Sequence, residues 1–158
     1  MTSLIVVVSY HHNNTQKIAE AMAKVLDAQV KSPQQASPEE LQKYDLVGFG
    51  SGIDSEKHYK ILLDFTDKLP QATNKRAFIF STSAMAEAAK NHSTLREKLQ
   101  SKGYIIVGEF NCPGFNTNGF LRYFGGMNKG RPNAEDLKHA EEFAQNLKHN
   151  ILKETIRG

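Results

Sequence analysis

Along this chain, short apolar runs of strand length alternate with longer segments in which apolar residues recur at helical spacing. Residues 4–8 are apolar at every position and mostly β-branched, as in a strand that is buried on both faces. From Ile18 to Leu26, apolar residues instead recur every three or four positions and leave Lys17 and Glu20 for solvent. This second pattern predicts a helix with one face against a core.

The same patterns divide the rest of the chain into further strands and helices. Strands are predicted at residues 28–31, 46–49, 77–80 and 104–110. Helices are predicted at residues 38–43, around 62–69, at 93–102 and after Asn133, and residues 111–132 form a long irregular segment. Strands that alternate with helices are typical of a parallel sheet covered on both faces, so the predicted fold class is α/β.

Residues with specific capping roles mark several helix ends. Ser37, Pro38 and Glu40 form the pattern of a capping box with proline at the first helical position. Gly103 follows the helix at 93–102, where a left-handed residue commonly ends a helix. These residues place the start of one predicted helix at Ser37 and the end of another at Gly103.

Length and composition indicate one domain. The 158 residues contain no internal repeat, low-complexity stretch or linker, so residues 1–158 are predicted to form a single domain. Cys112 is the only cysteine, which excludes an internal disulfide and argues against a cysteine-based zinc site. We expect Cys112 to be a partly buried, structural thiol.

Charge and hydropathy narrow the classes of partner. Lys and Arg number 20 against 17 Asp and Glu, a net charge of +3 that argues against a dedicated nucleic-acid binder. The longest apolar stretch, residues 4–8, is far shorter than the ~20 residues that span a bilayer. No basic segment precedes it and no cleavage-site pattern follows. We therefore expect a soluble, cytoplasmic protein that binds neither nucleic acid nor membrane.

Polar segments follow four of the predicted strands, at residues 9–15, 50–58, 81–92 and 111–132. The loops at the opposite ends of the strands are short. Since ligands of open α/β sheets bind beyond the carboxyl ends of the strands, we expect one site at that edge.

The first of these segments has the chemistry of an anion site. Residues 9–15 join a buried strand to a helix, so free backbone N–H groups and the helix dipole face the loop. The segment lacks the glycine-rich patterns that bind nucleotide triphosphates or dinucleotides, which favours a monophosphate. The alternative is a helix start capped by Asn13 or Asn14, with two exposed histidines.

Four motifs give the chain a resemblance to the flavodoxin family over about residues 1–150. They are Ser-Tyr-His-His-Asn-Asn-Thr at 9–15, Gly-Ser-Gly-Ile at 50–53, Ser-Thr-Ser at 81–83 and Cys-Pro-Gly-Phe at 112–115. The chain is most similar to the bacterial and archaeal flavodoxin-like proteins that carry these motifs in this order. The resemblance implies a flavodoxin-like three-layer sandwich, with a five-stranded parallel sheet of order 2-1-3-4-5 and helices on both faces.

The resemblance also implies FMN as the cofactor and identifies the residues that would bind it. Segments 51–58 and 81–92 would flank the isoalloxazine ring. The phosphate candidates are Ser9, His11, His12, Asn14 and Thr15. The candidates beside the ring are Ser51, Gly52, Ile53, Ser81, Thr82 and Ser83.

The chain departs from the family pattern at three places. His11, His12 and Asn13 replace the Thr-Gly part of the usual phosphate loop, although Asn13 can adopt the left-handed conformation of a glycine. Residues 54–56, Asp-Ser-Glu, stand where relatives often have Tyr-Phe-Gly, so Asp54 and Glu56 would repel an anionic flavin. Ala84 replaces a glycine next to the flavin edge. These departures weigh against tight flavin binding and leave the fold prediction unchanged.

Several aromatic and basic residues have two interpretations. Tyr10, Tyr59 and Phe115 are candidates for stacking on the flavin, with packing as the expected role. His58 is expected to be a solvated histidine at a helix start, with a bond to flavin or substrate as the alternative. Segment 110–134 is basic and aromatic and would be a lip for an acidic redox partner or a nicotinamide phosphate, or a loop packed on its own aromatics.

Three functions remain open. The chain would be an electron carrier that docks on a redox partner protein, or a small reductase that passes hydride from NAD(P)H through FMN to a quinone or similar small acceptor. It would otherwise be a flavodoxin-fold binding module that has lost FMN. The flavin would perform the chemistry, so no catalytic side chain is assigned, and the six histidines lack metal-ligand spacing. A sequence pI near 8.9 argues against an ordinary acidic carrier.

Overall fold

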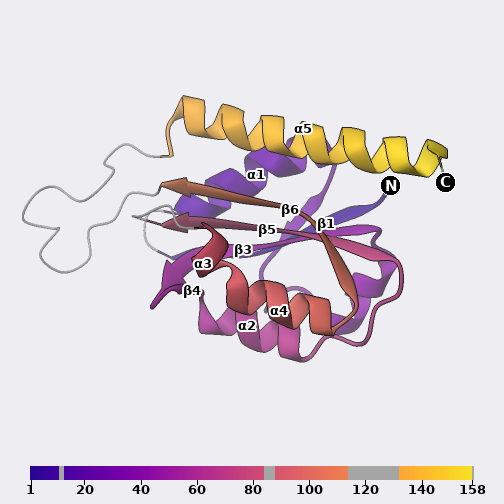
Figure 1. The fold of residues 1–158 in the computed structure, drawn as a ribbon. Coiled ribbons are helices and arrows are strands. Elements are labelled where there is room, and N and C mark those ends of the chain that lie inside the picture. Colours follow the sequence, from indigo (N-terminus) through magenta and orange to yellow (C-terminus); the bar gives the residue numbers. More distant parts are fainter. Residues whose placement is uncertain (11–12, 84–87, 114–131, 158) are drawn as a thin grey trace, which may run out of the picture.

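A twisted parallel sheet forms the centre of the molecule in the computed structural model, which describes all residues except 11–12, 84–87, 114–131 and 158 (Figure 1). The strand order is β2-β1-β3-β5-β6, in which β5 and β6 are the fourth and fifth parallel strands. The predicted order 2-1-3-4-5 is therefore confirmed. The strands are β1 (Ser3–Val8), β2 (Gln29–Lys31), β3 (Leu46–Asp54), β5 (Lys75–Ser83) and β6 (Tyr104–Pro113).

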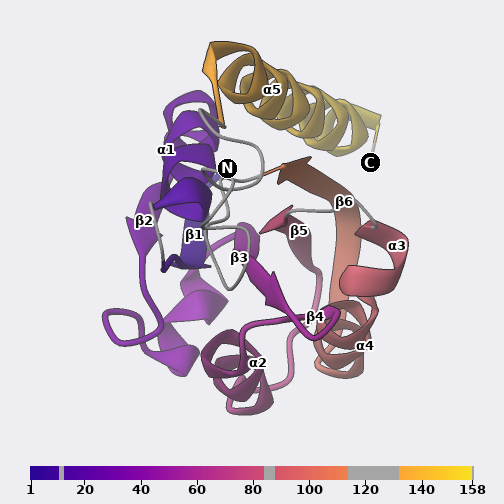
Figure 2. The ribbon, with the colours of Figure 1, turned by 90° about the vertical axis from the view of Figure 1, so that its left-hand side faces the viewer.

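Helices cover both faces of this sheet, which makes the predicted three layers (Figure 2). α1 (Asn14–Leu26) and α5 (Ala134–Arg157) pack on one face. α2 (Lys60–Asp67) and α4 (Ser93–Ser101) pack on the other, together with the 3-10 helix η1 (Pro38–Lys43). A short helix, α3 (Ala88–Asn91), precedes α4. Within the described ranges, no helix combines the length and the apolar composition that a membrane span requires.

Alternate side chains of the central strands enter two separate cores. In β1, Ile5 and Val7 face α1 and α5, whereas Leu4 and Val6 face α2 and α4. All six residues of β1 are buried, which confirms the prediction for the apolar run 4–8 and adds Ser3. Burying one such aliphatic side chain contributes roughly 1.5–3 kcal/mol, so the sheet is held from both sides.

The capping signals form as predicted. Ser37 Oγ accepts the Glu40 N–H at 3.3 Å, and the Glu40 carboxylate accepts the Ser37 N–H at 3.4 Å. Gly103 has a φ of 91°, the left-handed conformation expected after α4. β6 continues three residues beyond the predicted end, to Pro113, because it stays paired with β5 as far as Ser83.

A short hairpin at the end of β3 was not predicted. β3 extends to Asp54, turns through Ser55 and Glu56, and pairs antiparallel with β4 (Lys57–His58). Both turn residues have positive φ, 51° and 64°, as a two-residue hairpin turn of the right twist requires. Ser55 and Glu56 adopt this conformation although neither is a glycine or an asparagine. The sequence therefore carried no Asn-Gly type of signal for this turn.

The turn conformation predicts that Ser55→Gly stabilises the protein. Left-handed backbone costs an L-residue about 1–2 kcal/mol, whereas the greater freedom of glycine in the unfolded chain costs about 0.4–1 kcal/mol. We expect the free energy of unfolding to rise by about 0.5–1 kcal/mol, measured by urea denaturation. Ser55→Val is the control at the same position and should lose about 1 kcal/mol or more, since β-branched residues resist positive φ. A glycine variant no more stable than the valine variant would contradict this account.

Candidate functional site

The polar residues predicted to form a site lie in rows across the carboxyl edge of the sheet. The parallel register aligns Val8 with Ser51, Ser51 with Ser81, and Ser81 with Asn111. The next row aligns Gly52 with Thr82, and Thr82 with Cys112, which is buried as expected. The structure therefore brings the carboxyl ends of strands β1, β3, β5 and β6 to one edge, visible in Figure 2.

The loop between β1 and α1 presents the N-terminus of α1 to this edge. Asn13 is left-handed, with φ 55° and ψ 34°, which confirms that it takes the conformation usually supplied by glycine. Its side chain does not cap the helix. Ser9 does so instead, because its Oγ accepts the Gln16 N–H at 3.2 Å. The first turn of α1 contains no acidic residue, so the positive end of the helix dipole is not offset there. His11 and His12 lie outside the described residues.

The first two residues of α1 are buried at the edge of the sheet. Asn14 and Thr15 are 8% and 2% exposed. The hydroxyls of Thr15 and Thr82 share a buried hydrogen bond, with 2.7 Å between the two Oγ1 atoms. A predicted phosphate candidate and a predicted ring candidate are thus in direct contact, and this bond ties the start of α1 to the end of β5.

Ser51 and Gly52 shape the neighbouring wall. Ser51 is fully buried. Its hydroxyl donates to the Gly52 carbonyl at 2.6 Å and accepts the Tyr59 N–H at 3.0 Å, so it links the end of β3 to the residue that precedes α2. A Cβ on Gly52 would overlap the Tyr59 hydroxyl, so only glycine allows this tyrosine to lie over β3. Tyr59 stacks on Tyr10 with 5.1 Å between ring centroids, and Tyr10 is 52% exposed. Phe115, the third aromatic candidate, lies outside the described residues.

The hairpin carries the two carboxylates that depart from the family pattern. Asp54 and Glu56 are exposed, and Ile53 pairs with His58 across the hairpin. Glu56 forms an ion pair with Lys90 at 2.8 Å. The Glu56 charge is therefore partly neutralised, whereas the Asp54 carboxylate accepts only a long contact of 3.5 Å from Ser55 Oγ in the described part of the chain. Ala84 lies outside the described residues.

His58 is buried, and the expectation of a solvated histidine at a helix start is wrong. The residue belongs to β4, which folds its ring inward, and it is 2% exposed. Its Nε2 lies 2.9 Å from the Phe80 carbonyl oxygen and donates to it. Burial lowers the pKa of His58 to about 3, with a smaller contribution in the same direction from His92, so the ring is neutral near pH 7.

A hydrogen-bonded chain of polar side chains lies beneath the same edge. His92 Nε2 is 2.6 Å from Ser81 Oγ, and His92 Nδ1 is 2.9 Å from Glu109 Oε1. Arg96 donates to both oxygens of Glu109, from Nε at 2.8 Å and from Nη2 at 2.7 Å. Ser81 Oγ also lies 2.9 Å from Asn111 Oδ1. Ser81 was predicted at the site, but His92, Glu109 and Arg96 were missed, because only the fold brings these distant positions together.

The electrostatics of this chain favour an ionised Glu109 and a neutral His92. Burial opposes ionisation of Glu109, but hydrogen bonds from Arg96 and His92 outweigh it and lower its pKa. Burial also lowers the pKa of His92, against an upward contribution from Glu109. The Ser-His-Glu order is that of a hydrolytic triad, but Ser81 is fully buried in β5 and is not placed to attack a substrate.

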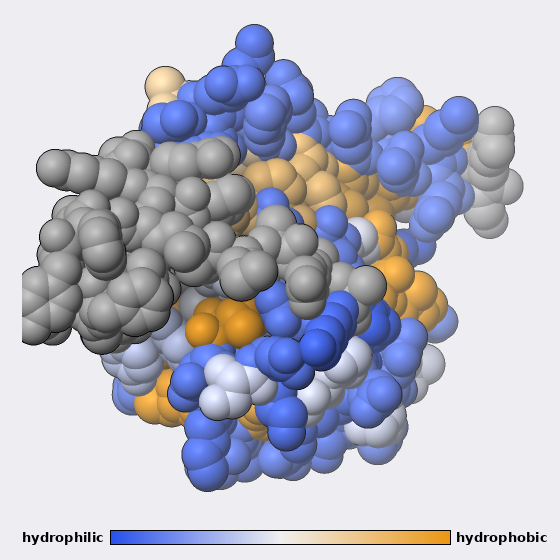
Figure 3. All heavy atoms as spheres, turned by 60° about the vertical axis from the view of Figure 1, so that its left-hand side comes forward, coloured by the Kyte–Doolittle hydropathy of each residue, from blue (hydrophilic) through white to orange (hydrophobic). Residues whose placement is uncertain are grey.

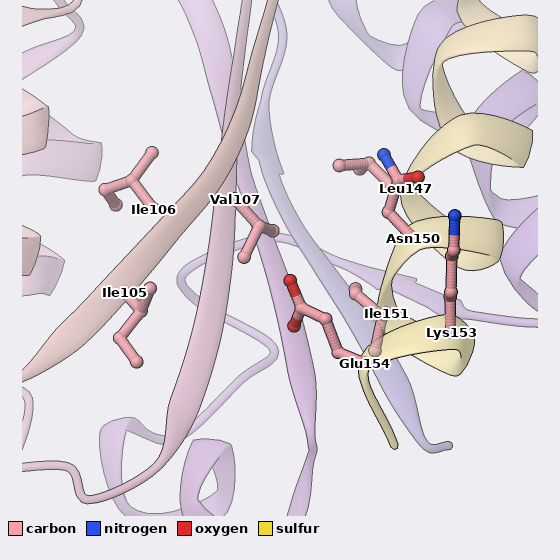
Figure 4. A pocket seen from close by; sticks show the side chains of 8 residues that line it. All are labelled: Ile105, Ile106, Val107, Leu147, Asn150, Ile151, Lys153 and Glu154. Carbon is pink, nitrogen blue, oxygen red and sulfur yellow. The ribbon is translucent and has the colours of Figure 1, made fainter. Parts of the chain in front are cut away.

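A groove of about 450 Å³ lies elsewhere, between the start of β6 and the second half of α5 (Figure 4). Its walls combine aliphatic residues of β6 and α5 with the polar residues Asn150, Lys153 and Glu154, and Figure 3 shows a hydrophobic band beneath the hydrophilic outer surface of α5. The lining residues Ile105 and Val107 precede the carboxyl edge by half of the strand. The groove is therefore separate from the candidate site. Most of segment 110–134, the predicted basic lip, lies outside the described residues.

Comparisons with known proteins agree with this architecture. The family model described as "Flavodoxin domain" matches residues 4–112. An uncharacterized protein of Methanocaldococcus jannaschii is 46% identical over 151 residues, which cover 95% of this chain and 100% of the relative.

Solved flavodoxin structures share the fold at low sequence identity. A flavodoxin of Streptococcus pneumoniae superposes with a TM-score of 0.72 at 16% identity, covering 95% of this chain and 99% of that chain. Oxidised Flavodoxin 2 of Bacillus cereus gives a TM-score of 0.71 at 18% identity, with the same coverage of 95% and 99%. At such identities the likeness supports the fold alone. The family model covers more than half of the chain and the sheet has the expected strand order, so this chain belongs to the flavodoxin family.

Proposed function

We propose that this protein binds FMN without a covalent bond and transfers electrons through it. The observation that carries the proposal is the meeting of the α1 N-terminus with the polar ends of β3 and β5 at one edge of the sheet. A cytoplasmic location is part of the proposal, and a single buried cysteine, Cys112, suits a reducing compartment.

The residues at the start of α1 fit a phosphate group. An anion is favoured at a helix N-terminus whose first turn lacks acidic side chains. Ser9 Oγ accepts a backbone N–H, so its own hydroxyl hydrogen is available to donate to a phosphate oxygen. Thr15 shares one hydrogen bond with Thr82, and whichever hydroxyl accepts in that pair retains a hydrogen to donate. Ser9, Asn14 and Thr15 would therefore hold the phosphate, together with His11 and His12.

The ends of β3, β5 and β6 fit a flat polar ring. Gly52 lets the Tyr59 ring lie over the end of β3, and Ser83 and Asn111 provide hydrogen-bonding groups. Asn111 Nδ2 is buried and has no hydrogen-bond partner among the described residues, so it would match an acceptor atom of a ligand. Bound flavin would supply the redox chemistry, since it accepts electrons singly or in pairs. The protein would orient the ring and set its electrostatic surroundings.

The phosphate site predicts a difference between FMN and riboflavin. Thr15→Ala, alone or combined with Asn14→Ala, should weaken FMN binding about 10-fold or more, because hydrogen bonds to a charged group contribute about 1.5–3 kcal/mol. Riboflavin has no phosphate, so its affinity should change little. Titration by flavin fluorescence measures both dissociation constants. Loss of the hydrogen bond to Thr82 should affect both ligands equally, so the ratio of the two affinities reports the contribution of the phosphate contacts alone.

Thr66→Ala is the matched control. Thr66 is also buried and its hydroxyl donates to the Leu63 carbonyl at 2.6 Å, but it lies near the end of α2, away from the carboxyl edge. This variant should lower stability without changing the ratio. An equal loss of both ligands in Thr15→Ala would place the phosphate elsewhere. A wild-type protein that binds neither ligand would instead support the binding-module alternative.

An electron carrier is expected to resist direct reduction by nicotinamide cofactors. The exposed carboxylate of Asp54 repels the phosphates of NADH and NADPH at the hairpin beside the ring site. In anaerobic stopped-flow experiments, the FMN-loaded protein should be bleached by dithionite but not by NADH or NADPH alone. Rapid bleaching by either nucleotide would support the reductase alternative. Asp54→Asn tests the stated cause, since removal of the charge should increase any residual rate.

A further inference from the structure

The proton positions in the chain formed by Arg96, Glu109, His92, Ser81 and Asn111 follow from its contacts. Glu109 accepts two hydrogen bonds from Arg96 and is ionised, so it accepts at its contact with His92 as well. His92 Nδ1 therefore carries a hydrogen. The protonation state of the ring is then decided at Nε2, which faces Ser81 at 2.6 Å.

Two arrangements of hydrogen atoms are possible, and the second keeps Asn111 Oδ1 toward Ser81 as in the structure. When His92 is neutral, Nε2 accepts the Ser81 hydroxyl hydrogen, and Asn111 must turn its amide so that Nδ2 donates to Ser81. When His92 is protonated, Nε2 donates to Ser81, and Ser81 donates to Asn111 Oδ1 at 2.9 Å. Ser83 Oγ also reaches Asn111 Oδ1, at 3.4 Å. The protonation of His92 is therefore linked to the amide orientation at the edge of the site.

The charges around His92 nearly cancel when its ring is neutral. Glu109 on β6 is paired with Arg96 on α4. His58 on β4 has its ring centroid 5.0 Å from that of His92 and is neutral near pH 7. On α3, Lys90 is paired with Glu56 at the surface. A negative charge placed at the end of β5 would thus be unmatched, and a proton on His92 would compensate it.

Solvent reaches one end of this chain. His92 is fully buried, but the side chains of Arg96 and Glu109 are each 26% exposed. Glu109 faces Nδ1, which already carries a hydrogen, so a proton taken up at Nε2 arrives from the Ser81 side, next to the candidate ring site.

We propose that His92 is a positioning residue that takes up a proton from solvent when negative charge arrives at the carboxyl edge of β5. This inference rests on the proposed function, because the charge would come from electrons delivered to bound flavin. In a two-electron reduction by dithionite, which is oxidised to sulfite, Nε2 of His92 gains one proton from water. The Ser81 hydroxyl hydrogen then turns from His92 to Asn111, the Asn111 amide turns its Oδ1 toward Ser81, and the new N–H bond of His92 is the one covalent bond of the protein that changes.

The first test needs no flavin. Ser83→Asp places a fixed carboxylate at the end of β5, and Ser83→Asn is the neutral control of similar size. NMR titration of the His92 ring should give a pKa about one pH unit higher in the aspartate variant, because a negative charge near a buried imidazole stabilises its protonated form. Equal pKa values in the two variants would overturn the proposal, whether or not the protein binds FMN.

The second test uses the FMN-loaded protein and measures its midpoint potential as a function of pH. Uptake of one proton with two electrons adds a slope of about 30 mV per pH unit to the wild-type potential. His92→Gln retains hydrogen-bonding groups but does not titrate, so its slope should be shallower by that amount. Parallel slopes in the two proteins would overturn the proposal.

The ion pair gives a third test that separates electrostatics from folding. Glu109→Gln removes the negative partner and should lower the pKa of His92, whereas Arg96→Gln removes a positive charge and should raise it. Both variants should lose stability, because each breaks the same pair. A purely structural role would leave the His92 titration unmoved, or move it in the same direction in both variants, and either result would contradict the proposal.

Discussion

Burial of the central strands on both faces is the constraint on which the rest of this molecule depends. Residues of β1 and the middle of β3 and β5 are enclosed between two layers of helices, so their side chains must be apolar along most of their length. Polar side chains are tolerated only where the strands emerge. Since the strands are parallel, they emerge together, and the polar side chains at their carboxyl ends gather at one edge.

At that edge, several buried polar side chains form hydrogen bonds with one another or with the backbone. Thr15 shares a hydrogen bond with Thr82, and Ser51 satisfies its hydroxyl with backbone groups of its own segment. His92 and Glu109 are held in one network by Arg96. Buried polar groups left unpaired would each cost about 1–3 kcal/mol, so these contacts keep the edge ordered before any ligand binds. His58 is neutral and donates from Nε2 to the Phe80 carbonyl, whereas its buried Nδ1 has no hydrogen-bond partner among the described residues.

Local sequence signals predicted local structure well. The capping box at Ser37, the left-handed Gly103 and the left-handed Asn13 formed as expected, because each depends on a few neighbouring residues. The hairpin at Ser55 and Glu56 was missed, since no glycine or asparagine marks its turn and the pairing with β3 overrides residue preference. His58 was misplaced for the same reason, because the unexpected β4 turns its ring into the interior.

Taken alone, the sequence determined the α/β class and the family, because these follow from apolar periodicity and from motifs of adjacent residues. It also located the candidate site to the segments after the strands. Only the tertiary structure decided which side chains share that site. His92 meets Ser81 and Glu109 because the register of β5 and β6 and the start of α4 place them together. Contacts between residues far apart in the chain depend on this packing, and no local pattern encodes them.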